Sequence, residues 1–175
     1  IDNLINIVMS PEMRYYDKMR WNEDPLESLN GDNSHVSYLS HLAWMICGYK
    51  EMGGDGKYDK LLSSLCMTMN HRILLSKSLN LPTYPDESIY IPDMLVAIVA
   101  LEKYADMNQG RYRSTVKKWL SKAQKEWIDV ETGLPYKNLY VAGIDAIDMG
   151  TQASAQDTDV SDFCIVIKKR SHGIS

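Results

Sequence analysis

The pattern of apolar and polar positions predicts helices along most of the first three quarters of the chain. Residues 2–19 follow helical spacing, and Pro11 within this stretch predicts a kink or a restart of the helix. Residues 21–33 are rich in Asn, Asp, Gly and Pro, which is typical of a long surface loop. The chain therefore opens with a helical segment that a polar loop separates from the next helix.

A second helix is predicted after Asn33 or Ser34, either of which can serve as its N-cap, and it ends at the glycine pair 53–54. The apolar side of this helix consists of Val36, Leu39, Leu42, Ala43, Ile46 and Cys47. A third helix is predicted over residues 58–75, where leucine, methionine and isoleucine recur at helical spacing.

Two further helices complete the predicted fold, which is all-α and built of helical hairpins. Residues 93–104 are apolar nearly all round, which indicates burial on most sides, and residues 112–127 are amphipathic. We expect residues 1–136 to form one helical-hairpin domain. Residues 137–175 show no clear amphipathic period and form an irregular C-terminal segment, either truncated or part of the same domain. The short apolar run 163–167 within it predicts a strand or a packed tail.

Composition and charge narrow the class of protein. A chain of 175 residues with 45% hydrophobic and 24% charged residues is typical of one soluble globular domain. The 19 basic and 23 acidic residues give a net charge of −4 without a basic stripe, so nucleic acid is not an expected partner. No apolar run approaches the roughly 18 residues needed to span a bilayer. A chain that starts at Ile1 leaves the compartment open, including a periplasmic or secreted location after signal removal.

Known chemical motifs are missing from the sequence. It has no Gly-rich phosphate loop, paired-cysteine zinc pattern, HExxH or GxSxG element, which argues against nucleotide, zinc-protease and serine-hydrolase chemistry. The three cysteines lack metal-like spacing, and the two in helical stretches, Cys47 and Cys66, are expected to be buried and inert. We expect neither a metal ion nor a cofactor.

The segment YPDESIYIPD, residues 84–93, is the strongest candidate for a functional loop. Pro85 and Pro92 restrict the residues before them, so the loop is expected to be stiff, with Tyr84 and Ile91 extended. The polar side chains gathered in this loop are Tyr84, Asp86, Glu87, Tyr90 and Asp93. The structural alternative is that Asp93 is only a helix-start charge and Asp86 an ordinary turn residue after proline.

Among the histidines, His41 is the best candidate for a general acid or base, because imidazole titrates near neutral pH. Tyr38 lies three residues earlier on the same helical face and could act with it. His35 lies six residues from His41, about 120° away on a helix, so the two do not easily share one site. The structural alternative is a buried histidine satisfied by a neighbour, with Tyr38 packed against it.

Three segments in order, YLSHLAWMICGYKEMGG, YPDESIYIPDMLVAIVALEKY and WLSKAQKEWIDVETGLPY, resemble the core of the linalool dehydratase/isomerase family over residues 34–136. Members of that family fold as an (α/α)6 toroid with the active site at its mouth. By resemblance, His41 falls on an active-site histidine. The functional cysteine pair of the family falls on Tyr84 and Asp93, and neither is cysteine here.

This departure implies a more polar pocket, suited to a small hydroxylated or carbohydrate-like substrate rather than a hydrocarbon. By analogy of fold with six-hairpin glycosidases and polysaccharide lyases, we expect acid/base chemistry of lyase or hydrolase type. The expected roles are acid for Asp86 or Asp93, base for His41, and substrate binding for Tyr38, Tyr84, Glu87 and Tyr90. The alternatives are a non-catalytic module that binds a carbohydrate or a peptide, and a purely structural scaffold.

The length of the chain bears on this resemblance. A six-hairpin toroid needs about twice this length, and half of one would expose a large apolar face that soluble monomers rarely tolerate. Either the sequence lacks the second half of a toroid or a second copy covers that face as a homo-oligomer. A compact helical bundle is the remaining alternative.

Overall fold

The computed structural model describes residues 1–31, 35–128, 131–133 and 138–139, and helices dominate it, which confirms the all-α prediction. The helices in chain order are α1 (Asp2–Val8), α2 (Pro11–Trp21), α3 (Val36–Glu51), the short 3-10 helix η1 (Gly56–Tyr58), α4 (Asp59–Leu75), α5 (Ile91–Met107) and α6 (Arg113–Glu126). Two short strands, β1 (Ile89–Tyr90) and β2 (Asn138–Leu139), pair antiparallel. Most of the C-terminal segment, including the run 163–167, lies outside the described residues.

The N-terminal segment restarts at the proline, as the sequence predicted. Helix α1 ends at Val8, and α2 begins at Pro11, where the missing N–H leaves no intrahelical bond unmade. The Ser10 side chain accepts a hydrogen bond from the backbone N–H of Met13, which makes Ser10 the N-cap of α2.

The starts of α3 and α5 differ from the predictions. The N-cap of α3 is His35, in the left-handed region at φ 50°, rather than Asn33 or Ser34, because its ring is buried against α2. The expectation that Ile91 is extended is wrong, because α5 already begins there and Tyr90 is the extended N-cap at φ −107°, ψ 112°. Pro92 then lies in the first turn, where helices tolerate proline.

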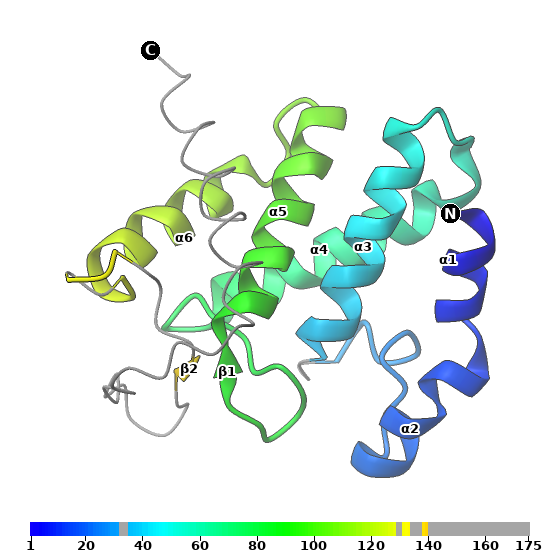
Figure 1. The fold of residues 1–175 in the computed structure, drawn as a ribbon, viewed down its shortest axis with the longest axis horizontal. Coiled ribbons are helices and arrows are strands. Elements are labelled where there is room, and N and C mark those ends of the chain that lie inside the picture. The colour runs from blue at the N-terminus through cyan, green and yellow to red at the C-terminus, as the bar shows by residue number, and fades with distance from the viewer. Residues whose placement is uncertain (32–34, 129–130, 134–137, 140–175) are drawn as a thin grey trace.

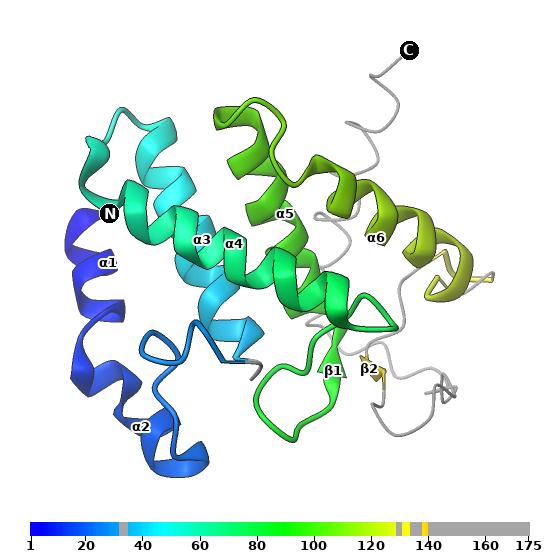
Figure 2. The same cartoon turned by 180° about the vertical axis from the view of Figure 1, so that it is seen from behind.

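Alternate helices lie side by side. Helices α3 and α5 run in the same direction and begin at the same end of the molecule, while α4 crosses behind them (Figure 1) and stands in front of them when seen from the other side (Figure 2). Helix α6 packs against α5, and α1 packs against α3. This order places the N-termini of α3 and α5, which carry the candidate site, next to each other. The resemblance to part of a toroid stays a prediction.

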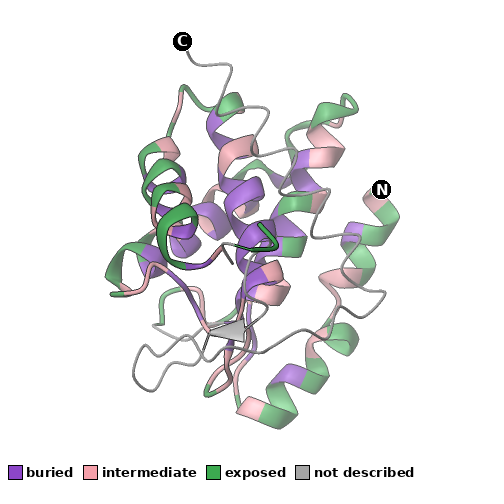
Figure 3. Ribbon diagram, turned by 60° about the vertical axis from the view of Figure 1, so that its left-hand side comes forward, coloured by how far each residue is buried: buried purple, intermediate pink, exposed green. Residues whose placement is uncertain are grey.

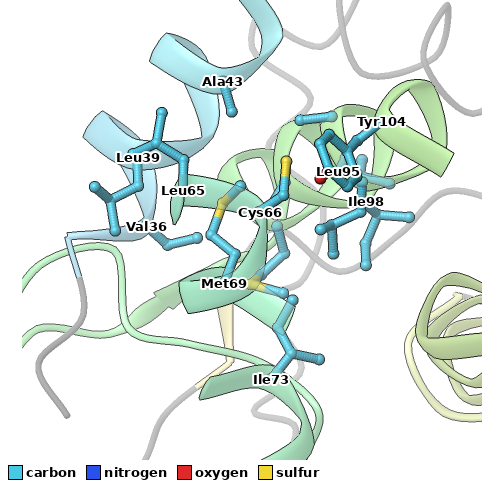
Figure 4. Close-up of a cluster of buried hydrophobic side chains, with 14 of the residues drawn as sticks. Val36, Leu39, Ala43, Leu65, Cys66, Met69, Ile73, Leu95, Ile98 and Tyr104 are labelled. Atoms are coloured by element: carbon cyan, nitrogen blue, oxygen red, sulfur yellow. The ribbon is translucent and has the colours of Figure 1, made fainter. Parts of the chain in front are cut away.

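One apolar core joins α3, α4 and α5 (Figure 4). Helix α5 is buried nearly all round, as its sequence predicted, and contributes Met94, Leu95 and Ile98. Cys47 and Cys66 are free thiols within this core, and burial raises the pKa of Cys47 to about 12 and raises that of Cys66 as well. This confirms the prediction that both are buried. Among the described residues, no helix is long and apolar enough to cross a membrane.

Side-chain hydrogen bonds from Thr68 and Arg72 of α4 hold the backbone of the loop after α2. The buried Arg72 guanidinium donates hydrogen bonds to the backbone carbonyls of Ser28 and Gly31, the shortest 2.9 Å long. Thr68, one turn earlier, donates to the carbonyl of Leu29 at 3.2 Å. The chain that leads into α3 is therefore held through its backbone by side chains of α4.

Candidate functional site

The Asp93 carboxyl is the buried centre of the candidate site. It lies in the first turn of α5, and only 8% of the residue is exposed. The Ser37 hydroxyl of α3 donates a hydrogen bond to Oδ1 at 3.3 Å. Burial raises the pKa of the Asp93 carboxyl above its ordinary value. The charge of His41 and the hydroxyls of Thr83 and Ser37 oppose this rise, so the carboxyl is within electrostatic reach of the imidazole.

Ser37 also fixes the tautomer of His41. The Nδ1 atom of His41 lies 2.7 Å from the backbone carbonyl oxygen of Ser37. Because a carbonyl oxygen can only accept a hydrogen bond, Nδ1 carries the proton, and in the neutral ring the lone pair lies on Nε2. His41 is exposed, so this lone pair can reach a molecule that approaches from solvent.

Tyr84 lies at the edge of the site, at the start of the loop 84–93, which contains Pro85 and Pro92 and is called the two-proline loop below. Its ring stacks on that of Trp21, with centroids 4.5 Å apart and planes 6° from parallel. Burial raises the pKa of the Tyr84 hydroxyl, and a hydrogen bond with the Ser37 side chain opposes that rise. Ser37 thus contacts Asp93, His41 and Tyr84, although sequence reasoning missed it, because a serine in the first turn of a helix is an ordinary polar residue.

Other predicted site residues lie apart from this cluster or are engaged elsewhere. The Tyr38 hydroxyl donates to the backbone carbonyl of Val8 at 2.9 Å, which directs it toward α1. Glu87 forms an ion pair with Arg20 of α2 at 3.2 Å. Asp86 is exposed on the loop in the left-handed region at φ 59°. Tyr90 is the half-buried N-cap of α5, and Asp93 follows in the first turn of the same helix.

No protein-family model and no curated protein matches this chain. The resemblance to the linalool dehydratase/isomerase family therefore stays a prediction. The interpretation of the site depends on its own geometry.

A second polar cluster, which the sequence did not reveal, lies beneath the Trp21 and Tyr84 rings. His35 is 1% exposed, with Nδ1 3.3 Å from Asp17 Oδ2 and Nε2 3.4 Å from Glu23 Oε2. Burial raises the pKa of the Asp17 carboxyl, and the charge of His35 opposes the rise. His35 is thus a buried histidine held between two carboxyl groups at ion-pair distance, whereas His41 is exposed, so the alternative of a buried His41 is wrong.

In the part of the chain that the structure describes, no group of three or more His, Cys, Asp or Glu side chains gathers where it could hold a metal ion. A groove of about 490 Å³ lies along α6. It is lined by Leu79, Lys117, Lys118, Ser121, Lys122, Lys125 and Glu126. None of these is a predicted site residue, and the lysine side chains give the groove a positive charge.

Proposed function

We propose that the protein is an acid/base enzyme of lyase or hydrolase type that acts on a small hydroxylated or carbohydrate-like substrate. One observation carries the proposal: Ser37 joins a buried carboxyl, Asp93, to an exposed imidazole, His41, at the adjacent starts of two parallel helices. A carboxyl whose pKa is raised and a histidine with a defined tautomer form a pair typical of general acid/base catalysis.

In this proposal His41 is the base. Its Nε2 lone pair accepts a proton from the substrate, while the hydrogen bond from Nδ1 to the Ser37 carbonyl holds the ring in place and stabilises the imidazolium that forms. Asp93 is the acid, and it donates its proton to the oxygen of the leaving group. The raised pKa favours the protonated form that this step needs.

Hydroxyl groups around the pair favour a hydroxylated substrate. Ser37, Thr83 and Tyr84 place three hydroxyls near the Asp93 carboxyl. Each hydroxyl can donate as well as accept a hydrogen bond, so together they suit a ligand that carries hydroxyl groups of its own. The positive ends of α3 and α5 also meet here, which favours negative charge that develops on a leaving oxygen.

The test is turnover of a panel of small hydroxylated compounds and oligosaccharides by the protein and its variants. Asp93→Asn and His41→Gln are each expected to lower kcat at least a hundredfold for any substrate that is turned over. His71→Gln is the matched control, because His71 is an exposed histidine on α4, outside the site. Unchanged turnover in both site variants would refute the proposal.

The second candidate is a non-catalytic module that binds a carbohydrate. The observation that favours it is the half-buried pair Trp21 and Tyr84 at the edge of the site, since an aromatic ring there can contact the apolar face of a sugar. Calorimetry separates the two functions. A binding module retains its ligand affinity in Asp93→Asn, loses it in Trp21→Ala, and turns over nothing.

A further inference from the structure

Helix α2 buries charged residues on its inner side and exposes large apolar and aromatic residues on its outer side. Asp17 is buried and Arg14 is half-buried, and both take part in ion pairs with the rest of the protein. On the outside, Met13, Tyr16 and Met19 are 57%, 62% and 66% exposed. Charged residues normally face water and apolar residues the interior, so the outer face of α2 has the composition of a contact surface.

Five of the exposed residues of α2 form one stripe with charges at its ends, while Tyr15 and Lys18 are exposed on another side of the helix. At 3.6 residues per turn, positions 12, 13, 16, 19 and 20 fall within roughly 120° of the helix circumference. The stripe therefore reads Glu12, Met13, Tyr16, Met19 and Arg20 from the N-terminus to the C-terminus of α2. Helix α2 lies at the outer edge of the molecule in both opposite views (Figures 1 and 2), and burial colouring shows its outward side as exposed (Figure 3).

This stripe complements itself. If two copies of α2 lie antiparallel about a two-fold axis at Tyr16, Met13 faces Met19 of the partner subunit. Glu12 then faces Arg20 of the partner subunit, and the axis repeats each contact once more. The two helix dipoles also oppose each other, which is the favourable arrangement for neighbouring helices. We propose that α2 is the interface of a homodimer of this chain.

Further apolar side chains are exposed on α1 and α2. Tyr15 of α2, together with Leu4 and Ile7 of α1, is also more than half exposed. In the proposed dimer Met13, Tyr16 and Met19 supply the apolar centre of the contact, and a standard interface of about 800 Å² from each partner extends beyond them to neighbouring surface. A second copy is favoured over an unrelated partner because the opposite charges stand at opposite ends of one stripe.

The interface would border the candidate site without depending on it. Arg20 already pairs with Glu87 of its own subunit, and Glu87 belongs to the two-proline loop. The guanidinium has five N–H donors, so it can also bind Glu12 of the partner subunit. Dimer formation would thus place the Arg20–Glu87 pair of each subunit next to Glu12 of the partner subunit. The proposal stands whether or not the protein is an enzyme.

The first experiment is the molar mass of the whole 175-residue chain by light scattering on a sizing column, over concentrations up to on the order of 100 μM. A mass of twice 20.0 kDa is expected. Met19→Glu is expected to give a monomer, because two carboxylates would be buried in the apolar stripe. The matched control is Leu75→Glu on α4, where the side chain is equally exposed at 64%, and it should remain dimeric.

A charge swap tests the register of the two helices. Glu12→Arg and Arg20→Glu each place like charges opposite each other twice, and each is expected to raise the dimer Kd about tenfold. The double variant restores opposite charges and should recover most of the lost affinity. A monomeric wild-type chain, a dimer that persists in Met19→Glu, or a double variant no better than the single variants would overturn the proposal.

Discussion

The Asp93→Asn variant tests the state of the buried carboxyl through stability alone, without any substrate. Because burial raises the pKa of Asp93 in the folded protein, the folded state binds this proton more tightly than the unfolded state does. The stability contributed by the protonated carboxyl is fully present below the pKa that Asp93 has in the unfolded protein. It is lost as pH rises through the pKa that Asp93 has in the folded protein. Asparagine is neutral throughout, so the variant avoids this loss.

The magnitude follows from linkage. Each unit by which the folded protein raises the pKa corresponds to about 1.4 kcal/mol of stability lost between acid and neutral pH. The amide oxygen of asparagine can still accept the hydrogen bond from Ser37, so the change that does not depend on pH should stay within about 1.5 kcal/mol. The variant should therefore gain stability relative to the wild type as pH rises from about 3 to 7.

The assay is urea denaturation followed by tryptophan fluorescence at a series of pH values. Asp86→Asn is the matched control, because it removes an exposed carboxyl from the same loop and asparagine tolerates the left-handed backbone at that position. If Asp93→Asn instead becomes steadily less stable than the wild type toward neutral pH, the carboxylate stabilises the start of α5. That result would refute both the raised pKa of Asp93 and its role as the acid.

Three further outcomes are expected. Ser37→Ala removes a hydrogen bond that lowers the pKa of Asp93, so that pKa should rise further in a carbon-13 NMR titration of the carboxyl group. His35→Ala removes the imidazole that faces the buried Asp17 carboxyl and the half-buried Glu23 carboxyl, and it should cost roughly 3 kcal/mol in chemical denaturation. Cys47 and Cys66 should resist an aromatic disulfide reagent in the native protein at pH 8 and react after unfolding, which peptide mapping by mass spectrometry can follow for each site.

Local periodicity was enough to place the helices. The apolar spacing in α3, α4 and α5 reports which side faces the core, and the proline and glycine signals report where helices start and stop. The N-cap of α3 could not be found this way. His35 caps that helix because its ring is buried between Asp17 and Glu23, a tertiary contact that leaves no local signal.

The candidate site was predictable only in part, for the same reason. His41 and Asp93 could be picked out from the sequence, because both carry ionisable side chains and Asp93 lies in a polar loop just before an apolar helix. The partners that decide what a side chain can do are distant in the chain: Tyr38 bonds a carbonyl 30 residues away, and Glu87 pairs with a guanidinium 67 residues away. Ser37 lies 56 residues from the carboxyl that it contacts, so only the fold reveals its part.

The polar attachment of α2 has a consequence for how the protein opens. The core of α3, α4 and α5 is apolar and includes no residue of α2, which is held by the Arg14–Asp24 ion pair and by the contact of Asp17 with His35. Buried ion pairs contribute less net stability than apolar burial does, so α2 should open at a lower free energy than the core. Its amide hydrogens would exchange with solvent before those of the core. The Trp21 ring that stacks on Tyr84 would leave the site with it, which makes the order of α2 a condition for a complete site.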